Sequence, residues 1–253
     1  MRTSNKILLG FIILCFLIPT FLMFSFKSKI NNGRFTIAKQ EGQGSNFRNG
    51  NFKPCKVIKF VSPEAGLLKA TIKQSDSLYY SYYMMNHQDS IKVTNVADTL
   101  VVELVNYELD GVDYRTDLNV TLKLPSCENL IIDNAEVMFD STAAFSGDLS
   151  VVLNGAGKLN IGRTKERRPG ADENEVREFP YSVNRLAVKM NGGELSVGSQ
   201  STIQQMDLRA EGQSAVIINN GAVIQELSGS LSEQSSVKAT WKYLKRLAAL
   251  TNE

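Results

Sequence analysis

Hydrophobic and polar residues alternate in short runs that recur along the second half of the chain. The runs start at Leu130, Leu149, Leu186, Met206 and Leu227. The spacings are 19, 37, 20 and 21 residues, and the long one returns to about one period when the charged insert 163–183 is looped out. A period of about 20 residues with two short strands per unit is typical of a parallel β-helix, in which stacked units share one core. We therefore expect an all-β fold of about 20-residue coils.

Glycine and asparagine residues separate the two strands of each unit, where a coil must turn. The expected corner residues are Asn154, Gly155, Asn191, Gly192, Gly193 and Gly212. Glycine and asparagine suit such corners because they adopt positive φ at low cost. Asn-Gly is also the strongest hairpin signal, so an antiparallel sandwich is the alternative. Before Leu130, strands are expected at 56–60, 67–74, 78–85, 90–94, 99–106 and 119–124, where β-branched and aromatic residues gather.

The N-terminal segment differs sharply from the rest because residues 7–26 carry no charge. As a helix this run is roughly 30 Å long, enough to cross a bilayer. We predict a stub at 1–6, a transmembrane helix or signal anchor at 7–26, a linker at 27–55, the β-helical domain at 56–240 and a C-terminal cap at 241–253. A cleaved signal with an unusual site is the alternative for the first segment.

Charge and localisation follow from the same division. Apart from Arg2 and Lys6, the chain carries 26 basic and 26 acidic residues, whereas nucleic-acid binding needs a basic surface. We therefore expect no nucleic-acid partner. The short stub and the β-rich body favour a single-pass protein of the cytoplasmic membrane whose body lies outside the cytoplasm, in the periplasm or at the cell surface.

Few residues carry recognisable chemistry. Cys55 and Cys127 are a possible disulfide in an oxidising compartment, or two unpaired buried thiols. His87 is the single histidine and lies in a polar stretch without a nucleophile motif. Loose acidic candidates for calcium or sugar chemistry are Asp110, Asp113, Asp140, Asp148 and Asp207. We expect no catalytic residues, no metal site and no cofactor.

Three surface features are candidates for contacts with a partner. The tyrosines Tyr79, Tyr80, Tyr82 and Tyr83 form one strand, with Tyr80 and Tyr82 on one face. Exposed aromatic rings suit sugar or protein contacts, although packing against a neighbouring element explains them too. The basic half of the insert, 163–168, is a solvated loop or a site for an acidic partner. The apolar residues Trp241, Leu244 and Leu247 have helical spacing and suit a cap or a partner-binding helix.

The order of several motifs resembles the head GIN domain family, an adhesin-head family of bacterial envelope proteins. The resemblance runs from Ile58 to Ala239 and includes Ser62-Pro63-Glu64, ATIKQSDS, TLVVEL, the run 120–132 and the Leu-x-Val-x-Leu units. It implies a right-handed parallel β-helix, export from the cytoplasm and no catalytic residues.

The functional expectation is adhesive or structural binding of an extended partner, a glycan or an envelope protein, by a membrane-anchored domain. A polysaccharide-active β-helix enzyme and an accessory subunit of an envelope signalling or transport complex are the alternatives.

Overall fold

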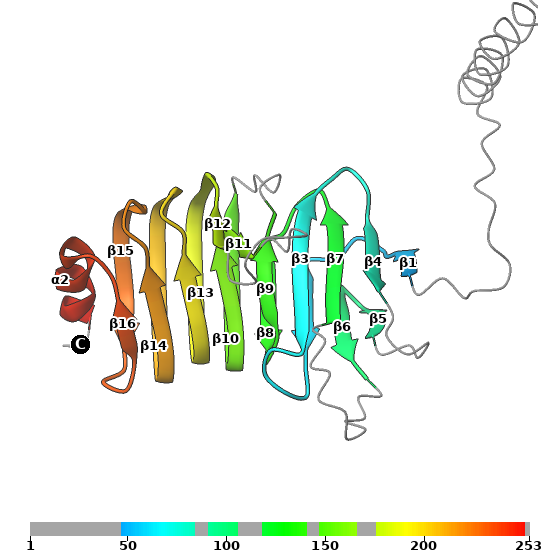
Figure 1. The fold of residues 1–253 in the computed structure, drawn as a ribbon, viewed down its shortest axis with the longest axis horizontal. Coiled ribbons are helices and arrows are strands. Elements are labelled where there is room, and N and C mark those ends of the chain that lie inside the picture. Colours follow the sequence, from blue (N-terminus) through cyan, green and yellow to red (C-terminus); the bar gives the residue numbers. More distant parts are fainter. Residues whose placement is uncertain (1–46, 84–90, 106–117, 141–146, 166–175, 251–253) are drawn as a thin grey trace, which may run out of the picture. The chain divides into compact units, whose positions relative to one another are not determined.

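The computed structural model describes residues 47–83, 91–105, 118–140, 147–165 and 176–250. All of them belong to one compact unit, Ser45–Glu253 (Figure 1). The strands are β1 Phe47–Asn51, β2 Val57–Val61, β3 Leu68–Gln74, β4 Tyr79–Tyr83, β5 Ile91–Val96, β6 Thr99–Leu104, β7 Leu118–Leu124, β8 Asn129–Asp133, β9 Glu136–Phe139, β10 Asp148–Ile161, β11 Arg163–Lys165, β12 Val176–Glu178, β13 Tyr181–Val197, β14 Ser201–Ile218, β15 Val223–Leu231 and β16 Ser236–Lys238. One helix, α2, spans Trp241–Leu250.

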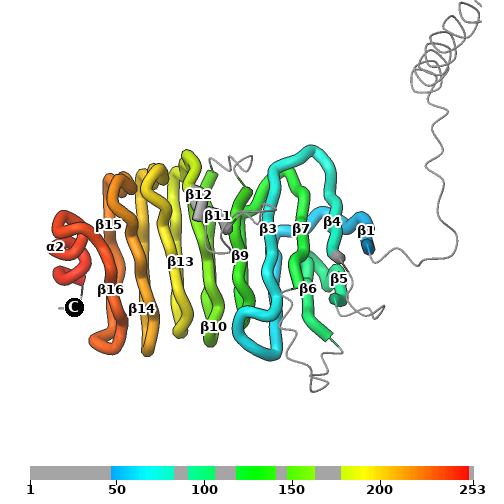
Figure 2. Tube along the Cα trace, in the orientation of Figure 1, coloured from blue at the N-terminus to red at the C-terminus, as the bar shows by residue number. Residues whose placement is uncertain are grey.

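The C-terminal half of the sheet is parallel and follows chain order. β10, β13, β14 and β15 lie side by side, as Figures 1 and 2 show. The register places Leu186 between Leu149 and Met206, and Leu227 opposite Met206. Because side chains alternate across a strand, these rows turn inward and form a continuous core, while polar residues between them face outward.

The N-terminal half of the sheet is mixed and does not follow chain order. β2 lies between β6 and β8, and β3 between β7 and β9, all in parallel. By contrast, β4 is antiparallel to β1 and β7, and β5 to β6. In the β5–β6 hairpin Val96 pairs with Thr99, and Ala97 has a φ of 50°. Such a two-residue turn sends the chain straight back, which a coil cannot do.

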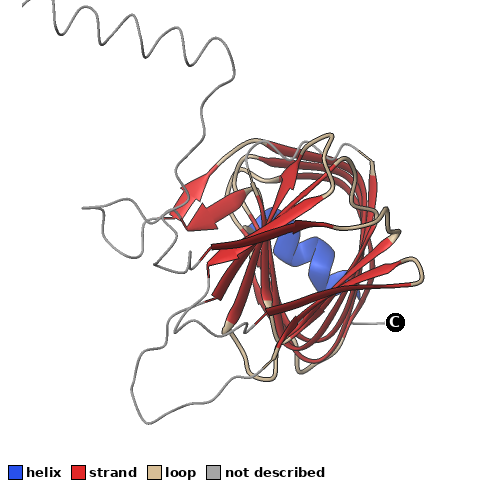
Figure 3. Ribbon diagram, turned by 90° about the vertical axis from the view of Figure 1, so that its right-hand side faces the viewer, coloured by secondary structure: helices blue, strands red, loops and turns tan. Residues whose placement is uncertain are grey.

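These pairings correct the predicted fold class. The described chain forms one 14-stranded mixed sheet, curled as a half-barrel (Figure 3), and a separate two-stranded sheet of β11 and β12. The prediction of a parallel β-helix is wrong because the antiparallel strands at its N-terminal side interrupt the stacking of coils. No helix among the described residues is long and apolar enough to cross a membrane. The predicted span 7–26 lies outside those residues, so the structure adds no transmembrane helix to this fold.

The expected corners lie within strands instead of between them. β10, β13 and β14 run without interruption through 154–155, 191–193 and 212, and bend there. Gly193 has a φ of 82°, and a Cβ on it would overlap the carbonyl oxygen of Gly157. The first halves of these strands therefore lie on one wall of the curl and the second halves on the next, as the split pairing of β10 with β8 and β9 shows.

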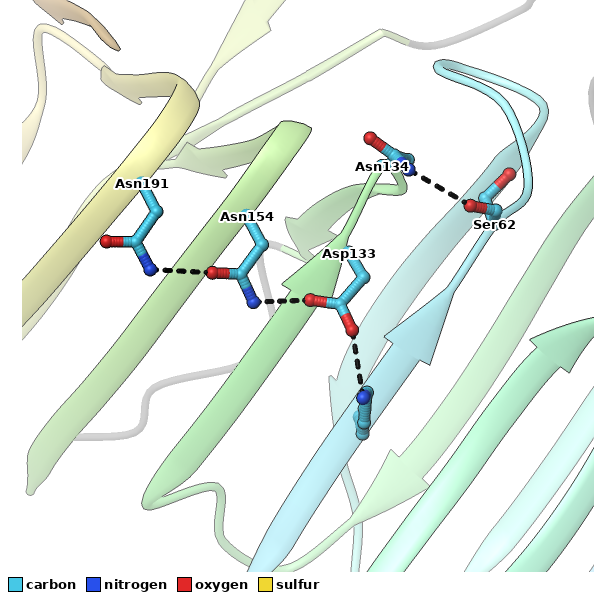
Figure 4. Close-up of polar contacts among 6 residues, drawn as sticks. Ser62, Asp133, Asn134, Asn154 and Asn191 are labelled. Carbon is cyan, nitrogen blue, oxygen red and sulfur yellow. Dashed lines mark hydrogen bonds and ion pairs between the residues drawn. The ribbon is translucent and has the colours of Figure 1, made fainter. Parts of the chain in front are cut away.

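A chain of polar side chains crosses the sheet at this bend (Figure 4). Asn191 donates to Asn154 over 2.9 Å, and Asn154 donates to Asp133 over 2.5 Å. The other carboxylate oxygen of Asp133 lies 2.9 Å from the ammonium nitrogen of Lys59. The ladder thus joins β2, β8, β10 and β13 by side chains as well as by backbone.

The helix α2 lies across the end of the curled sheet next to β15 (Figures 1 and 3). Its Tyr243 and Leu247 are buried in the core. The Tyr243 hydroxyl donates to the carbonyl of Ala222 over 2.8 Å and accepts from the backbone N–H of Ile224 over 2.9 Å. Arg246 donates to the carbonyls of Ile224 and Gln225. The helix therefore satisfies backbone groups at an edge where no further strand pairs.

Candidate functional site

A hollow in the described surface lies near the starts of β8, β10 and β13. Its volume is about 600 Å³. It is lined by Gln74, Pro125, Ser126, Cys127, Glu128, Asn129, Gly147, Asp148, Leu149, Ser150, Arg185 and Ala187. A smaller hollow of about 190 Å³ shares Arg185 with it and is otherwise lined by Gln205, Met206, Asp207, Glu226, Leu227 and Ser228. We call the two together the outer groove.

Parallel register places the polar groups of the outer groove in two rows. One row crosses four strands in the order Asp148, Arg185, Gln205, Glu226. The second row runs Asn129, Ser150, Ala187, Asp207, Ser228, and its polar groups are interrupted at Ala187. With about 4.8 Å between neighbouring strands, the first row spans about 14 Å. The groove therefore presents regularly spaced hydrogen-bonding groups along a line, which matches an extended ligand better than a compact one.

Neighbouring side chains hold the ends of the first row in place. Asn184 donates to Asp148 over 3.1 Å, and Gln205 donates to Glu226 over 3.1 Å. Four carboxylates line the groove, on Glu128, Asp148, Asp207 and Glu226, beside the one guanidinium of Arg185. The acidic balance repels polyanions, while carboxylates, amides and hydroxyls hydrogen-bond well to neutral hydroxyl groups.

The tyrosine strand β4 is mostly a packing element. The rings of Tyr80 and Tyr82 stack with centroids 6.3 Å apart, and Tyr82 is buried. The Tyr82 hydroxyl donates to the carbonyl of Ile91 over 3.2 Å. Tyr80 covers Gly50 of β1, where a Cβ would overlap its ring. Tyr79 carries the ammonium of Lys123 5.6 Å from its ring centre. The side chain of Tyr83 lies outside the description, and no residue of β4 lines the outer groove.

Cys55 and Cys127 are free thiols in the structure, so their pairing stays a prediction. Cys127 lies at the inner wall of the outer groove and is almost fully buried. Burial raises its pKa to about 12, with smaller contributions from Cys55 and Glu128. Burial also raises the pKa of the Cys55 thiol. A protonated thiol is a poor nucleophile and metal ligand, so neither cysteine is prepared for chemistry at neutral pH.

The other predicted residues are dispersed. Asp140 is 3.2 Å from the ammonium of Lys73, whereas Asp148 and Asp207 line different ends of the outer groove. His87, Asp110, Asp113 and residues 166–168 lie outside the described residues. Within the described chain, no three His, Cys, Asp or Glu residues gather closely enough to hold a metal.

The corner residues line a third, shallow hollow of about 480 Å³. Its walls are Gly155, Asn191, Gly192, Glu211, Gly212 and Gln213. It is much more open than the outer groove and is made largely of backbone, so it supplies fewer groups for recognition.

Sequence reasoning did not single out Arg185 or Glu128. Both lie next to inward-facing residues in the alternating pattern. This pattern predicts that their side chains are exposed but does not show that they line a groove. What identifies them is the strand order, because Glu128, immediately before β8, and Arg185, in β13, line the same hollow.

Solved structures with a similar fold come from Bacteroidetes. A "putative adhesin" from Parabacteroides merdae matches with a TM-score of 0.51 at 14% identity, over 78% of this chain and 81% of its own. A "putative adhesin" from Bacteroides fragilis has a TM-score of 0.38 at 13% identity, covering 76% and 95%. A "putative lipid binding protein" from Parabacteroides distasonis has a TM-score of 0.35 at 9% identity, and the match covers 77% of this chain and 97% of that one.

At these identities the likeness concerns the fold, and only the first of the three carries weight. No protein-family model and no curated protein matches the sequence. The comparison with the Parabacteroides merdae protein thus supports the fold and assigns no family.

Proposed function

We propose that this protein is a non-catalytic, adhesin-like binding protein whose outer groove holds an extended neutral glycan. The observation that carries the proposal is the pair of polar rows, set in register by four parallel strands. A polymer of repeating hydroxylated units presents hydrogen-bonding groups at intervals along its length, and the groove presents partners along a line of about 14 Å.

The acidic balance of the groove supports a neutral ligand over an anionic one. Glu128 and Asp148 both line the larger hollow, just before Asn129 and Ser150 along the chain, and Arg185 supplies its only formal positive charge among the described residues. Burying phosphate or sulfate groups beside these carboxylates would leave like charges close together, which is unfavourable.

Two further parts of the proposal concern location and family. The uncharged run 7–26 supports placement at the cytoplasmic membrane, and the short stub 1–6 with the β-rich body supports a domain outside the cytoplasm. The ordered motifs from Ile58 to Ala239, together with the fold shared with the Parabacteroides merdae protein, support membership of the head GIN domain family.

The test is a screen of the full-length protein, in detergent, against neutral and anionic oligosaccharides of increasing length. We expect neutral chains to bind, with affinity rising until the ligand spans the groove. Arg185→Ala should weaken binding of the best ligand about tenfold or more, because a hydrogen bond to a charged group contributes about 1.5–3 kcal/mol. The matched control is Lys189→Ala, which removes the same charge from the same face of β13 outside the groove.

Equal losses in the two variants would contradict the groove as the binding site. A polysaccharide-active enzyme remains the second candidate because Glu128 and Asp148 share one hollow. New reducing ends that disappear in Asp148→Asn would establish cleavage and overturn the non-catalytic part of the proposal.

A further inference from the structure

The helix α2 has one face that the packing of the domain uses and one that it does not. Tyr243 and Leu247 enter the core, and Arg246 binds carbonyls of β15. The opposite face carries Trp241, which is 70% exposed, with Lys242 and Lys245 also exposed. Figure 1 shows α2 at the end of the sheet, next to β15.

These three exposed residues form one patch, which we call the tryptophan face. On a helix, residues three and four apart are neighbours, so Lys245 adjoins both Trp241 and Lys242. The ammonium of Lys245 lies 5.1 Å from the centre of the Trp241 ring. The helix holds three basic residues and no acidic one along its whole length. Its exposed side is therefore both positively charged and aromatic.

This combination has a specific chemical match. Tryptophan prefers the boundary between lipid headgroups and hydrocarbon, where its ring is buried and its N–H stays hydrogen-bonded. Lysines beside it can reach negatively charged headgroups, whose attraction for basic residues near the membrane surface is electrostatic. The outer groove and the shallow hollow at the strand bends contain no residue of α2.

We propose that the tryptophan face of α2 docks the domain onto the surface of an anionic lipid bilayer. The complementarity is between Lys242 and Lys245 and acidic headgroups, with Trp241 entering the headgroup region. Each lysine near an anionic surface contributes about a fivefold gain in affinity, since its electrostatic attraction is worth about 1 kcal/mol. The docking site is independent of the outer groove.

The experiment uses the full-length protein in vesicles and reads the fluorescence of Trp241, which is the single tryptophan of the chain. Emission reports the environment of this one side chain, so attachment of the chain through residues 7–26 alone leaves it unchanged. We expect a shift to shorter wavelength, and protection from an aqueous quencher, in vesicles rich in phosphatidylglycerol but not in vesicles of phosphatidylcholine alone.

Reversal of the two charges, Lys242→Glu with Lys245→Glu, should abolish both the emission shift and the protection from the quencher in anionic vesicles. The control reverses two exposed lysines elsewhere, Lys53→Glu with Lys92→Glu, and should behave as the unmodified protein. Unchanged circular dichroism in both variants establishes that each has folded. Emission that is the same in both lipids would overturn the proposal, and it is also the result expected if the face binds an acidic protein instead. A shift that survives in the α2 variant would overturn it as well.

Discussion

At the scale of single residues, two buried tyrosines show how differently one side chain can be accommodated. Tyr243 uses its hydroxyl as donor and acceptor between two backbone groups of β15 and its entry turn. Tyr181 is equally buried, packs against Phe139 with ring centres 5.4 Å apart, and its hydroxyl has no partner among the described residues. Burial of that hydroxyl also raises the pKa of Tyr181.

The same substitution should therefore have opposite effects at the two positions. Tyr181→Phe removes an unsatisfied buried oxygen and should raise the free energy of unfolding by about 1 kcal/mol. Tyr243→Phe leaves an N–H and a carbonyl without their partner and should lower it by about 1–3 kcal/mol. Denaturant titration of the two variants measures both, and effects of the same sign would contradict the hydrogen-bond assignment.

The raised pKa of Cys127 has a consequence for stability at high pH. The folded protein keeps the proton up to about pH 12, whereas the unfolded thiol loses it near pH 9. The unfolded state thus binds fewer protons between these values, and stability present below pH 9 is lost as pH rises toward 12.

We expect the free energy of unfolding to fall across this window with an added slope of up to about 1.4 kcal/mol per pH unit. The measurement is denaturant titration at several pH values, with Cys127→Ala as the reference. That variant should be less stable at pH 8 but should lack the added slope; an identical slope in both proteins would show that Cys127 does not titrate as described.

At the scale of the strand, the bends of β13 and β14 differ in how closely a neighbouring backbone approaches. Gly193 and Gly212 both have positive φ, at 82° and 59°. A Cβ on Gly193 would overlap the carbonyl oxygen of Gly157, whereas a Cβ on Gly212 would meet nothing within 4 Å. The two positions therefore separate the cost of backbone conformation from the cost of crowding.

Gly193→Ala should cost about 3 kcal/mol, from left-handed strain and from displacement of β10. Gly212→Ala should cost only about 1 kcal/mol, because strain acts alone. Thermal or chemical unfolding of the two variants tests this. Similar losses would mean that the neighbouring strand yields without cost.

The strands also show what the sequence predicts and where it stops. The period from Leu149 to Leu227 was readable because β10, β13, β14 and β15 pair in chain order. The start at Leu130 is displaced, since Leu130 lies opposite Val151 and not Leu149. Antiparallel pairing of β1 with β4 joins segments with no shared period, so nothing in the alternation predicted it. The outer groove follows from the order of β8, β10 and β13 in the sheet. The alternation along the chain marks Arg185 as outward but does not show this order, so Arg185 was missed.

At the scale of the whole domain, α2 covers the last strand of the parallel sheet and so ends the sheet. In the described chain β15 pairs only with β14, and α2 binds its free backbone groups through Tyr243 and Arg246. An uncovered edge of a regular sheet is a template for pairing with another chain.

A chain that stops after Thr240 should therefore self-associate as its concentration rises, through the exposed edge of β15. Light scattering of the truncated and full-length proteins in the same detergent measures this. Tyr243→Phe is the control, because it weakens the contact but keeps the helix in the chain. Truncated protein that stays monodisperse over the same concentrations would show that another feature protects the edge.

The pairing of β2 and β3 with strands that come much later in the sequence has a further consequence for folding during synthesis. Val57 of β2 pairs with Asn129, and Lys69 of β3 pairs with Glu136, and each partner is synthesised about 70 residues later. A chain that emerges N-terminus first thus exposes apolar strands such as Ile58-Lys59-Phe60 before their partners exist, and such edges attract wrong partners. The later strands add one at a time, each onto a finished neighbour about 20 residues behind. Strands β2 and β3 have all their parallel partners once synthesis has passed residue 139. The strands that follow each add to a sheet that has already formed.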